Sequence, residues 1–267
     1  MKVVAALQNG ALESELEAHG LEVLRLNSVE GVAACCAADP SFAVIDEALP
    51  IAAELIVGLK ALVDGPDRDR LPIFAINSTQ NGLLRCEPDA FLKAPTAETI
   101  VEASKAIVMR RARQRRLVDQ EVVLRVPTTP EQVDRAAELL EQLIKAAGFN
   151  EDDSTKLEMI IREAVGNAAE HGNQNDPERK IHINYLRSSD RLTIVVTDEG
   201  EGFDTSNFLS RADEVSPLEH TRSRRETEDR PGGLGVFMMK KTCDTVAFNE
   251  VGNSIYLMKF LPGHASS

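Results

Sequence analysis

Tryptophan is absent from the 267 residues, aromatic side chains make up only 4% of them, and the four cysteines form no CxxC pair. The core must therefore be built from aliphatic side chains. Without paired spacing, or a histidine at zinc-ligand spacing beside them, the cysteines are expected to be reduced and mostly buried. No stretch approaches the roughly 20 apolar residues that a membrane-spanning helix needs, and the N-terminus has no secretory pattern. These absences predict a cytoplasmic protein that does not contact a membrane.

Basic residues are outnumbered by acidic ones. The chain has 30 Lys and Arg against 43 Asp and Glu, a net charge of −13. So acidic a protein repels the phosphate backbone, and we expect no binding to nucleic acid. The one basic run, Met109 to Arg116, has no aromatic residues between its arginines. We interpret it as a solvated helix face, or as a coupling helix that contributes to a homodimer interface.

The first half of the chain, residues 1–117, alternates short apolar runs with helical patterns that glycine and proline interrupt. The apolar runs predict five strands: Val3–Leu7, Leu21–Leu26, Phe42–Asp46, Leu71–Ile76 and Ala90–Leu92. Strands that alternate with helices in this way favour a doubly wound parallel sheet in an α/β domain. Sites in such sheets form at the carboxyl ends of the strands, where Asp46, Asn77 and Ser78 are expected.

These strand-end residues resemble those of a response-regulator receiver domain. Asp46 matches that family's phosphoacceptor, and Lys93 with nearby Pro95 matches its lysine-proline turn. The match breaks at the first strand, where receivers carry two acids for magnesium and this chain has Leu7 to Asn9. We therefore expect a degenerate, receiver-like domain. Asp46 is either a phosphoacceptor or a strand-end acid that pairs with Lys93.

The second half, residues 118–267, is organised around the stretch from Leu157 to Asn173. Asp153 or Ser154 is expected to cap the start of this helix, and Gly172 to end it. Apolar residues recur there at helical spacing, so one stripe faces a core: Leu157, Ile160, Ile161, Ala164, Val165 and Ala168.

Glu163, Asn167 and His171 are successive fourth residues of this helix. They are therefore predicted to line one edge of it. A carboxylate, an amide and an imidazole arranged in this way could form one wall of a polar site.

The remaining patterns of the second half predict a two-layer α/β sandwich. Thr129 to Gln132 is typical of a helix start, with a threonine cap, a proline in first place and a glutamine that closes a capping box. Alternation predicts a strand pair and a hairpin: Lys180–Leu186, Arg191–Thr197, Asp244–Val251 and Ser254–Leu261. Helices grouped together with strands paired locally favour two layers.

Two glycine-rich segments flank these elements. Asp198 to Gly202 (DEGEG) follows an apolar strand, and its glycines allow close approach of the backbone to a ligand. Gly232 to Gly235 (GGLG) opens a helix, whose bare amides suit phosphate oxygens. The helix motif and these two segments, in this order, resemble the GHKL-type ATPase domain, most of all that of the bacterial anti-sigma-factor serine/threonine kinases. The resemblance covers the chain from near Glu121 to Pro262.

The resemblance implies a role for each matched residue, with ATP and Mg²⁺ as cofactors. Glu163 would be catalytic, because it orients or deprotonates the attacking hydroxyl, and Asn167 would bind the metal ion. Asp198 would accept a hydrogen bond from the adenine amino group. His171 would touch phosphate or magnesium-bound water, or only hydrogen-bond near the helix end. The full set expected at the nucleotide is Asn167, His171, Asp198, Gly200, Gly202, Gly232, Gly233 and Gly235.

The expected function is that of an ATP-dependent serine/threonine protein kinase of the anti-sigma-factor type. Its partners would be a small antagonist protein as substrate and a sigma factor. The alternative is a non-catalytic, ATP-gated switch for protein binding. A sensor histidine kinase is a weaker reading, because His19 is the only histidine before His171. Residues 204–230, which are rich in charge and in arginine, are expected to form a lid over ATP.

Overall fold

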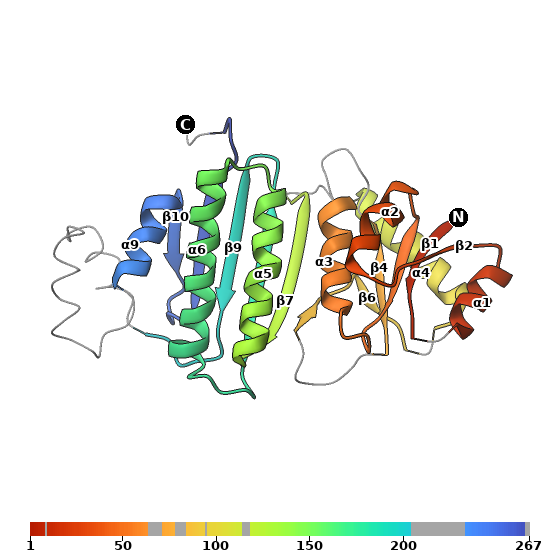
Figure 1. Cartoon of the computed structure of the whole chain (residues 1–267), viewed down its shortest axis with the longest axis horizontal. Helices are drawn as coiled ribbons and strands as arrows, with labels where there is room; N and C mark the ends of the chain where they lie inside the picture. The colour runs from red at the N-terminus through yellow and green to blue at the C-terminus, as the bar shows by residue number, and fades with distance from the viewer. Residues whose placement is uncertain are drawn as a thin grey trace. The chain divides into compact units, whose positions relative to one another are not determined.

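The computed structural model describes residues 1–8, 10–63, 71–77, 84–93, 95–113, 118–203 and 233–264. By its internal contacts the chain divides into two compact units, Met1–Asn81 with Arg85–Val122 and Gly82–Leu84 with Val123–Ser267. Figure 1 shows the helices and strands of each unit. Among the helices of these described ranges, none is both long and apolar enough to cross a bilayer.

The first unit is built on a five-stranded sheet with the order β2-β1-β3-β4-β6 (Figure 1). Neighbouring strands run parallel throughout, as their alternation with helices predicted. The elements are β1 (Lys2–Ala6), α1 (Ala11–Ala18), β2 (Glu22–Arg25), the 3-10 turn Val29–Gly31, α2 (Val32–Ala37), β3 (Phe42–Asp46), α3 (Ala52–Val63), β4 (Ile73–Ile76), β6 (Ala90–Phe91) and α4 (Ala97–Arg113).

Strands β3 and β4 form the centre of this unit. All residues of both strands are buried, which explains why they read as continuous apolar runs instead of alternating ones. Phe42 and Phe74 meet edge to face across the sheet, with their ring centroids 6.2 Å apart. The carboxyl end of β3 therefore places Asp46 in a closely packed environment.

The second sheet has six strands, in the order β10-β11-β9-β8-β7-β5. The pairs β8–β9, β9–β11 and β10–β11 are antiparallel, so the predicted strand pair and hairpin are confirmed. Figure 1 shows α5, α6 and α9 against one face of this sheet. The elements are β5 (Arg85–Cys86), β7 (Gln120–Pro127), α5 (Pro130–Ala146), α6 (Glu151–Asn167), β8 (Lys180–Arg187), β9 (Arg191–Thr197), α9 (Gly233–Thr242), β10 (Thr245–Phe248) and β11 (Ser254–Phe260).

Alternate residues of β8 and β9 are buried, which gives the sheet one face toward the helices. Ile181, Ile183 and Tyr185 on β8 are fully buried, and every second residue of β9 is also buried. Their helical counterparts are the buried positions of α6, which match the predicted apolar stripe. Helix and sheet are thus held together by the packing of aliphatic side chains and Tyr185.

The helix ends differ in part from what the spacing predicted. Thr129 occupies the N-cap position of α5 with Pro130 in first place, but its side chain makes no capping hydrogen bond. The expected capping box is also wrong, because the Gln132 side chain accepts from the Leu84 N–H at 2.7 Å. The cap of α6 is Asn150, whose side chain accepts from the Asp153 N–H at 2.9 Å, and not Asp153 or Ser154.

Beyond Asn167, α6 continues for one π-helical turn, Ala168–Gly172. The Asn173 N–H closes this turn on the Ala168 carbonyl at 2.8 Å. A wider turn inserted at the end of an α-helix is a frequent feature of functional sites.

Candidate active site

Glu163 and Asn167 lie one turn apart on α6, as predicted. The Asn167 amide nitrogen donates to Glu163 Oε1 at 3.4 Å, which leaves the Asn167 amide oxygen available as a ligand. Glu163 is exposed, while the apolar side of α6 is buried. His171 is exposed and lies within the π turn, where the spacing of side chains is wider than in the α-helix. Glu163 and Asn167 therefore share one edge of α6 as predicted, whereas His171 lies in the wider π turn.

The start of α9 lies directly against Glu163. A Cβ atom on Gly235 would come within 2.3 Å of Glu163 Oε1, so no side chain fits there unless the carboxylate moves. Gly233 is the first residue of α9. Gly232 and the predicted lid, residues 204–230, lie outside the described residues.

Asp198 follows the last residue of β9 and is half-buried. Burial raises the pKa of its carboxyl group, and a hydrogen bond from the Gly200 N–H to Oδ1 at 2.8 Å partly offsets that rise. The other carboxylate oxygen, Oδ2, receives no hydrogen bond from the described part of the chain, although the positive charge of Arg179 also acts to lower the pKa of the group. Asp198 therefore retains an acceptor that a ligand could use.

Two glycines enclose this carboxylate. A Cβ on Gly172 would lie 2.2 Å from the Asp198 Cγ atom, and a Cβ on Gly200 would lie 2.3 Å from the Gly172 carbonyl oxygen. Gly172, at the end of the π turn, is thus brought against the start of the DEGEG segment. The helix motif and the strand-end motif meet at this contact.

Gly202 has a different environment. Its φ of +76° favours glycine, and a Cβ there would lie 2.0 Å from the Val251 carbonyl oxygen. The Phe203 N–H donates to the same carbonyl at 3.1 Å. Gly202 therefore packs the segment against the turn between β10 and β11.

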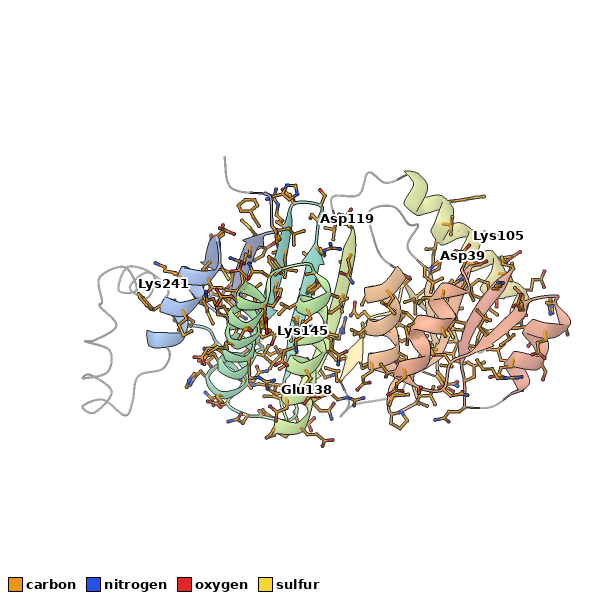
Figure 2. The ribbon with its side chains drawn as sticks, turned by 45° about the horizontal axis from the view of Figure 1, so that its top comes forward. Asp39, Lys105, Asp119, Glu138, Lys145 and Lys241 are labelled. Carbon is orange, nitrogen blue, oxygen red and sulfur yellow. The ribbon has the colours of Figure 1, made fainter. Side chains whose placement is uncertain are left out.

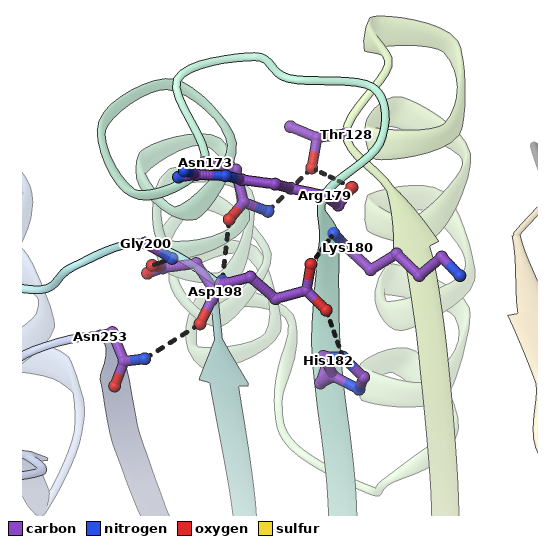
Figure 3. Close-up of polar contacts among 9 residues, drawn as sticks. Thr128, Asn173, Arg179, Lys180, His182, Asp198, Gly200 and Asn253 are labelled. Atoms are coloured by element: carbon purple, nitrogen blue, oxygen red, sulfur yellow. Dashed lines mark hydrogen bonds and ion pairs between the residues drawn. The ribbon is translucent and has the colours of Figure 1, made fainter.

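Two residues that the sequence analysis did not assign to the site, Asn173 and Asn253, bond to the backbone at or directly after Asp198 (Figure 3). Asn173 is completely buried, and its side chain connects Thr128 with the peptide of Glu199. Asn253 bonds to the backbone of Asp198. Asn173 and Asn253 stand in polar stretches that resemble ordinary loops, so their spacing carried no signal.

Asp46, in the first unit, is 2% exposed and hydrogen-bonded at both carboxylate oxygens. Oδ2 accepts from Asn77 Nδ2 at 3.0 Å and from the Gln8 N–H at 3.5 Å, and Oδ1 accepts from the Ala48 N–H at 3.0 Å. Lys93 is exposed and is not among these partners, so the expected Asp46–Lys93 pair is wrong for the described residues. Asn9 and Ser78 lie outside them.

In the part of the chain that the structure describes, no three His, Cys, Asp or Glu side chains come together as a metal site. Asn167 offers one amide oxygen, a donor that Mg²⁺ accepts beside water and the oxygens of a bound phosphate.

The sequence that forms this site matches a known protein family. Residues 126–259 match the model of the histidine kinase-like ATPase domain. The serine-protein kinase RsbW of Bacillus subtilis (strain 168) is 29% identical over 143 residues, which is 53% of this chain and 86% of that protein. The serine-protein kinase RsbW of Listeria monocytogenes serotype 4a (strain HCC23) is 28% identical over 141 residues, 52% of this chain and 87% of its own length.

One solved structure, the SiaB–SiaC complex from Pseudomonas aeruginosa, matches with a TM-score of 0.39 and 12% identity, over 60% of this chain and 99% of that chain. A likeness of this strength supports no conclusion. The family match rests on different ground, because it spans the helix motif, the strand-end aspartate and the start of α9. The chain belongs to the histidine kinase-like ATPase domain family.

Proposed function

We propose that the protein is an ATP-dependent serine/threonine protein kinase of the anti-sigma-factor type, which phosphorylates a small antagonist protein. The observation that carries this proposal is the environment of Glu163. Its Oε1 atom contacts the Asn167 amide and lies against the backbone of Gly235. A module that only binds nucleotide has no need for a base at this position. The similarity to two proteins named serine-protein kinase supports the same reading.

The nucleotide would lie between α6, the end of β9 and the start of α9. Oδ2 of Asp198, which no donor among the described residues reaches, suits the adenine amino group, and Gly172 and Gly200 place only backbone against that carboxylate. Backbone N–H groups at the start of α9 suit phosphate oxygens, since the first amides of a helix lack partners within it.

Asn167 fits a magnesium ligand. Its amide nitrogen is engaged with Glu163, which directs the remaining amide oxygen toward other groups. Magnesium prefers oxygen ligands and commonly retains water, so one protein oxygen beside phosphates is a suitable donor set. When bound, Mg²⁺ would offset the negative charge of the phosphate oxygens.

Glu163 would act on the hydroxyl group of the antagonist. As the serine or threonine oxygen bonds to the γ-phosphorus, Glu163 would accept the hydroxyl proton. The bond between the γ-phosphorus and its bridging oxygen would break, and ADP would leave with that electron pair. Base assistance of this kind contributes about 10²–10⁴-fold in rate.

We extend the proposal to the organisation of the chain. Residues 1–117 would form a receiver-like domain and residues 118–267 the kinase domain. The parallel strand order β2-β1-β3-β4-β6 and the strand-end Asp46 support the first assignment. A sigma factor as second partner, a homodimer and a cytoplasmic location complete the proposal, with the first domain as a docking or dimerisation module.

The test uses γ-labelled ATP with Mg²⁺ and extract from the source cells. The parent protein should label a small protein band, and Glu163→Gln should lower the rate of labelling at least about 100-fold while ADP affinity stays unchanged. Glu138→Gln is the matched control, because Glu138 is an exposed carboxylate on α5 (Figure 2) and should leave labelling intact.

Three other outcomes would contradict the proposal. If Glu163→Gln labels the band at the parent rate, Glu163 is not the base. If the parent binds ATP but transfers no label, the protein is an ATP-gated switch. If the parent binds no nucleotide, the kinase assignment fails altogether.

A further inference from the structure

The side chain of Asn173 is fully buried and joins three segments that are distant in the sequence (Figure 3). Its amide nitrogen donates to Thr128 Oγ1 at 2.8 Å, just beyond β7. Its amide oxygen accepts from the Glu199 N–H at 2.8 Å, directly after Asp198. Thr128 Oγ1 in turn donates to the Arg179 carbonyl at 2.9 Å, just before β8. Both ends of the Asn173 amide are therefore engaged, and its orientation is determined.

The peptide of Asp198 is held from the opposite side by Asn253. The Asp198 N–H donates to the Asn253 carbonyl at 3.0 Å, and Asn253 Nδ2 donates to the Asp198 carbonyl at 3.1 Å. One residue later, the Asn173 side chain holds the Glu199 N–H. The aspartate therefore sits between two asparagines from different parts of the chain.

The Glu199 side chain is bound to β8. Its Oε2 atom accepts from the Lys180 N–H at 3.0 Å, and its Oε1 atom lies 3.4 Å from His182 Nε2 (Figure 3). Both contacts are on β8. The segment after Asp198 thus cannot rotate without breaking bonds to β8 and to Asn173.

Little room remains for Asp198 to shift. Gly172 lies against its carboxylate, and Asn173 is the next residue in the chain. The same turn therefore confines the carboxylate through Gly172 and anchors the following peptide through Asn173. Loss of the anchor would let the carboxylate change its direction without removing it.

We propose that Asn173 is a positioning residue, which aims the Asp198 carboxylate at the 6-amino group of adenine and so determines base selectivity. The inference rests on the proposed function, in which Asp198 recognises adenine. Asn173 itself would not touch the nucleotide, because it is completely buried. Its loss should therefore reduce discrimination between bases more than it reduces the binding of phosphate.

The experiment measures the affinity of the full chain, with Mg²⁺, for ADP and for purine riboside diphosphate, which lacks only the 6-amino group. The parent should prefer ADP by on the order of tenfold or more, as expected for a hydrogen bond to a charged acceptor. Asn173→Ala should lower this ratio to below about threefold. If Asn173 served stability alone, its loss would reduce the fraction of protein that is folded and able to bind nucleotide. The ratio of the two affinities would stay unchanged.

Two further variants make the result specific. Asp198→Ala should remove the preference entirely. Tyr185→Phe removes another buried hydrogen bond, which joins β8 to α5 from the tyrosine hydroxyl to the Leu143 carbonyl at 3.2 Å. This variant should keep the affinity ratio of the parent. If Asn173→Ala does not fold, Thr128→Val removes the partner of the amide nitrogen and should shift the ratio in the same direction by a smaller factor.

The outcomes separate the two proposals. If Asp198→Ala removes the preference for ADP but Asn173→Ala and Thr128→Val keep it, the positioning role is wrong and the adenine site stands. If the parent shows no preference, or Asp198→Ala retains it, the assignment of Asp198 fails and the positioning role falls with it.

Discussion

Each unit places an aspartate at the end of a buried strand, and the two aspartates have different surroundings. Asp46 is 2% exposed, and its carboxylate accepts from three N–H groups. Asp198 is half-buried and accepts from one, that of Gly200, while Oδ2 has no donor in the described part of the chain. A strand-end carboxylate alone therefore does not indicate a ligand site. What separates the two aspartates is whether a carboxylate oxygen still lacks a hydrogen-bond donor among the described residues.

The neighbours of the two carboxylates explain the difference. The Asn77 amide and two backbone N–H groups fill the space around Asp46. Against the Asp198 carboxylate lie Gly172 and Gly200, which supply backbone but no side chain. Desolvation then outweighs the hydrogen bond from the Gly200 N–H and the smaller effects of its own N–H and of the Arg179 charge, so the pKa of Asp198 is raised.

The largest effect is expected from Asp46→Ala, which should lower the free energy of unfolding of the first unit by up to about 3 kcal/mol. The substitution leaves three N–H donors without their acceptor; those of the exposed Gln8 and Asn77 can turn to water, whereas an unsatisfied buried donor costs about 1–3 kcal/mol, so about 3 kcal/mol is the upper end of the expected loss. Urea unfolding followed by circular dichroism measures the change. Asp198→Ala should cost much less, because its carboxylate accepts one hydrogen bond and is partly solvated.

The same two variants should reverse their order when ADP affinity is measured. Asp198→Ala is expected to weaken ADP binding about 10- to 100-fold, and Asp46→Ala to leave it unchanged. An Asp46→Ala protein that unfolds at the parent urea concentration, or that binds ADP less tightly, would remove the distinction between the two carboxylates.

The parts of this arrangement that depend on local spacing could be predicted from the sequence. Alternation of strands and helices gave the parallel sheet, and period-two runs gave the strands of the second sheet. Glu163 and Asn167 were recognisable because residues four apart share a helix edge. The predicted parallel sheet and the predicted apolar stripe of α6 are confirmed because each reflects a short-range pattern.

The interactions that depend on distant partners could not be predicted. Asn173 bonds to a side chain 45 positions earlier and to a peptide 26 positions later, and neither separation follows a periodic rule. Gln132 fitted a capping box, but in the folded chain it accepts from Leu84, 48 positions away. The Gln132 side chain fits the local capping pattern, but its bond to the distant Leu84 replaces the capping bond that the pattern predicted.

Two glycines extend the comparison into the candidate site and should give different kinetic effects. Gly172→Ala places a Cβ 2.2 Å from the Asp198 Cγ atom and should raise the KM for ATP about tenfold or more. Gly235→Ala places a Cβ 2.3 Å from Glu163 Oε1 and should lower kcat by a similar factor with a smaller change in KM. Steady-state labelling of the antagonist at varied ATP concentration separates the two.

Gly166→Ala is the matched control for these substitutions. Gly166 lies on the same helix, but among the described residues nothing beyond its chain neighbours and its own helix backbone lies within 4 Å of the position that its Cβ would take. The variant should be more stable than the parent by up to about 1 kcal/mol, since alanine favours the helix over glycine. Equal losses of kcat/KM in all three variants would mean that the close contacts at Gly172 and Gly235 have no specific role.

The smallest effect is expected from Asp198→Asn in the absence of nucleotide. Because burial raises the pKa of Asp198 in the folded state, its charged form is disfavoured by folding. The stabilising contribution of this group is therefore complete below about pH 4 and is lost as the pH rises through the folded-state pKa. Asparagine keeps the acceptor for the Gly200 N–H but cannot ionise, so at pH 7 the variant should be more stable by a few tenths of a kcal/mol, a small gain because the side chain is partly solvated. Thermal unfolding from pH 7 down to pH 4 should show this gain shrinking toward acid, and a gain that grows toward acid would mean that the Asp198 carboxylate is stabilised by folding, as a structural carboxylate is.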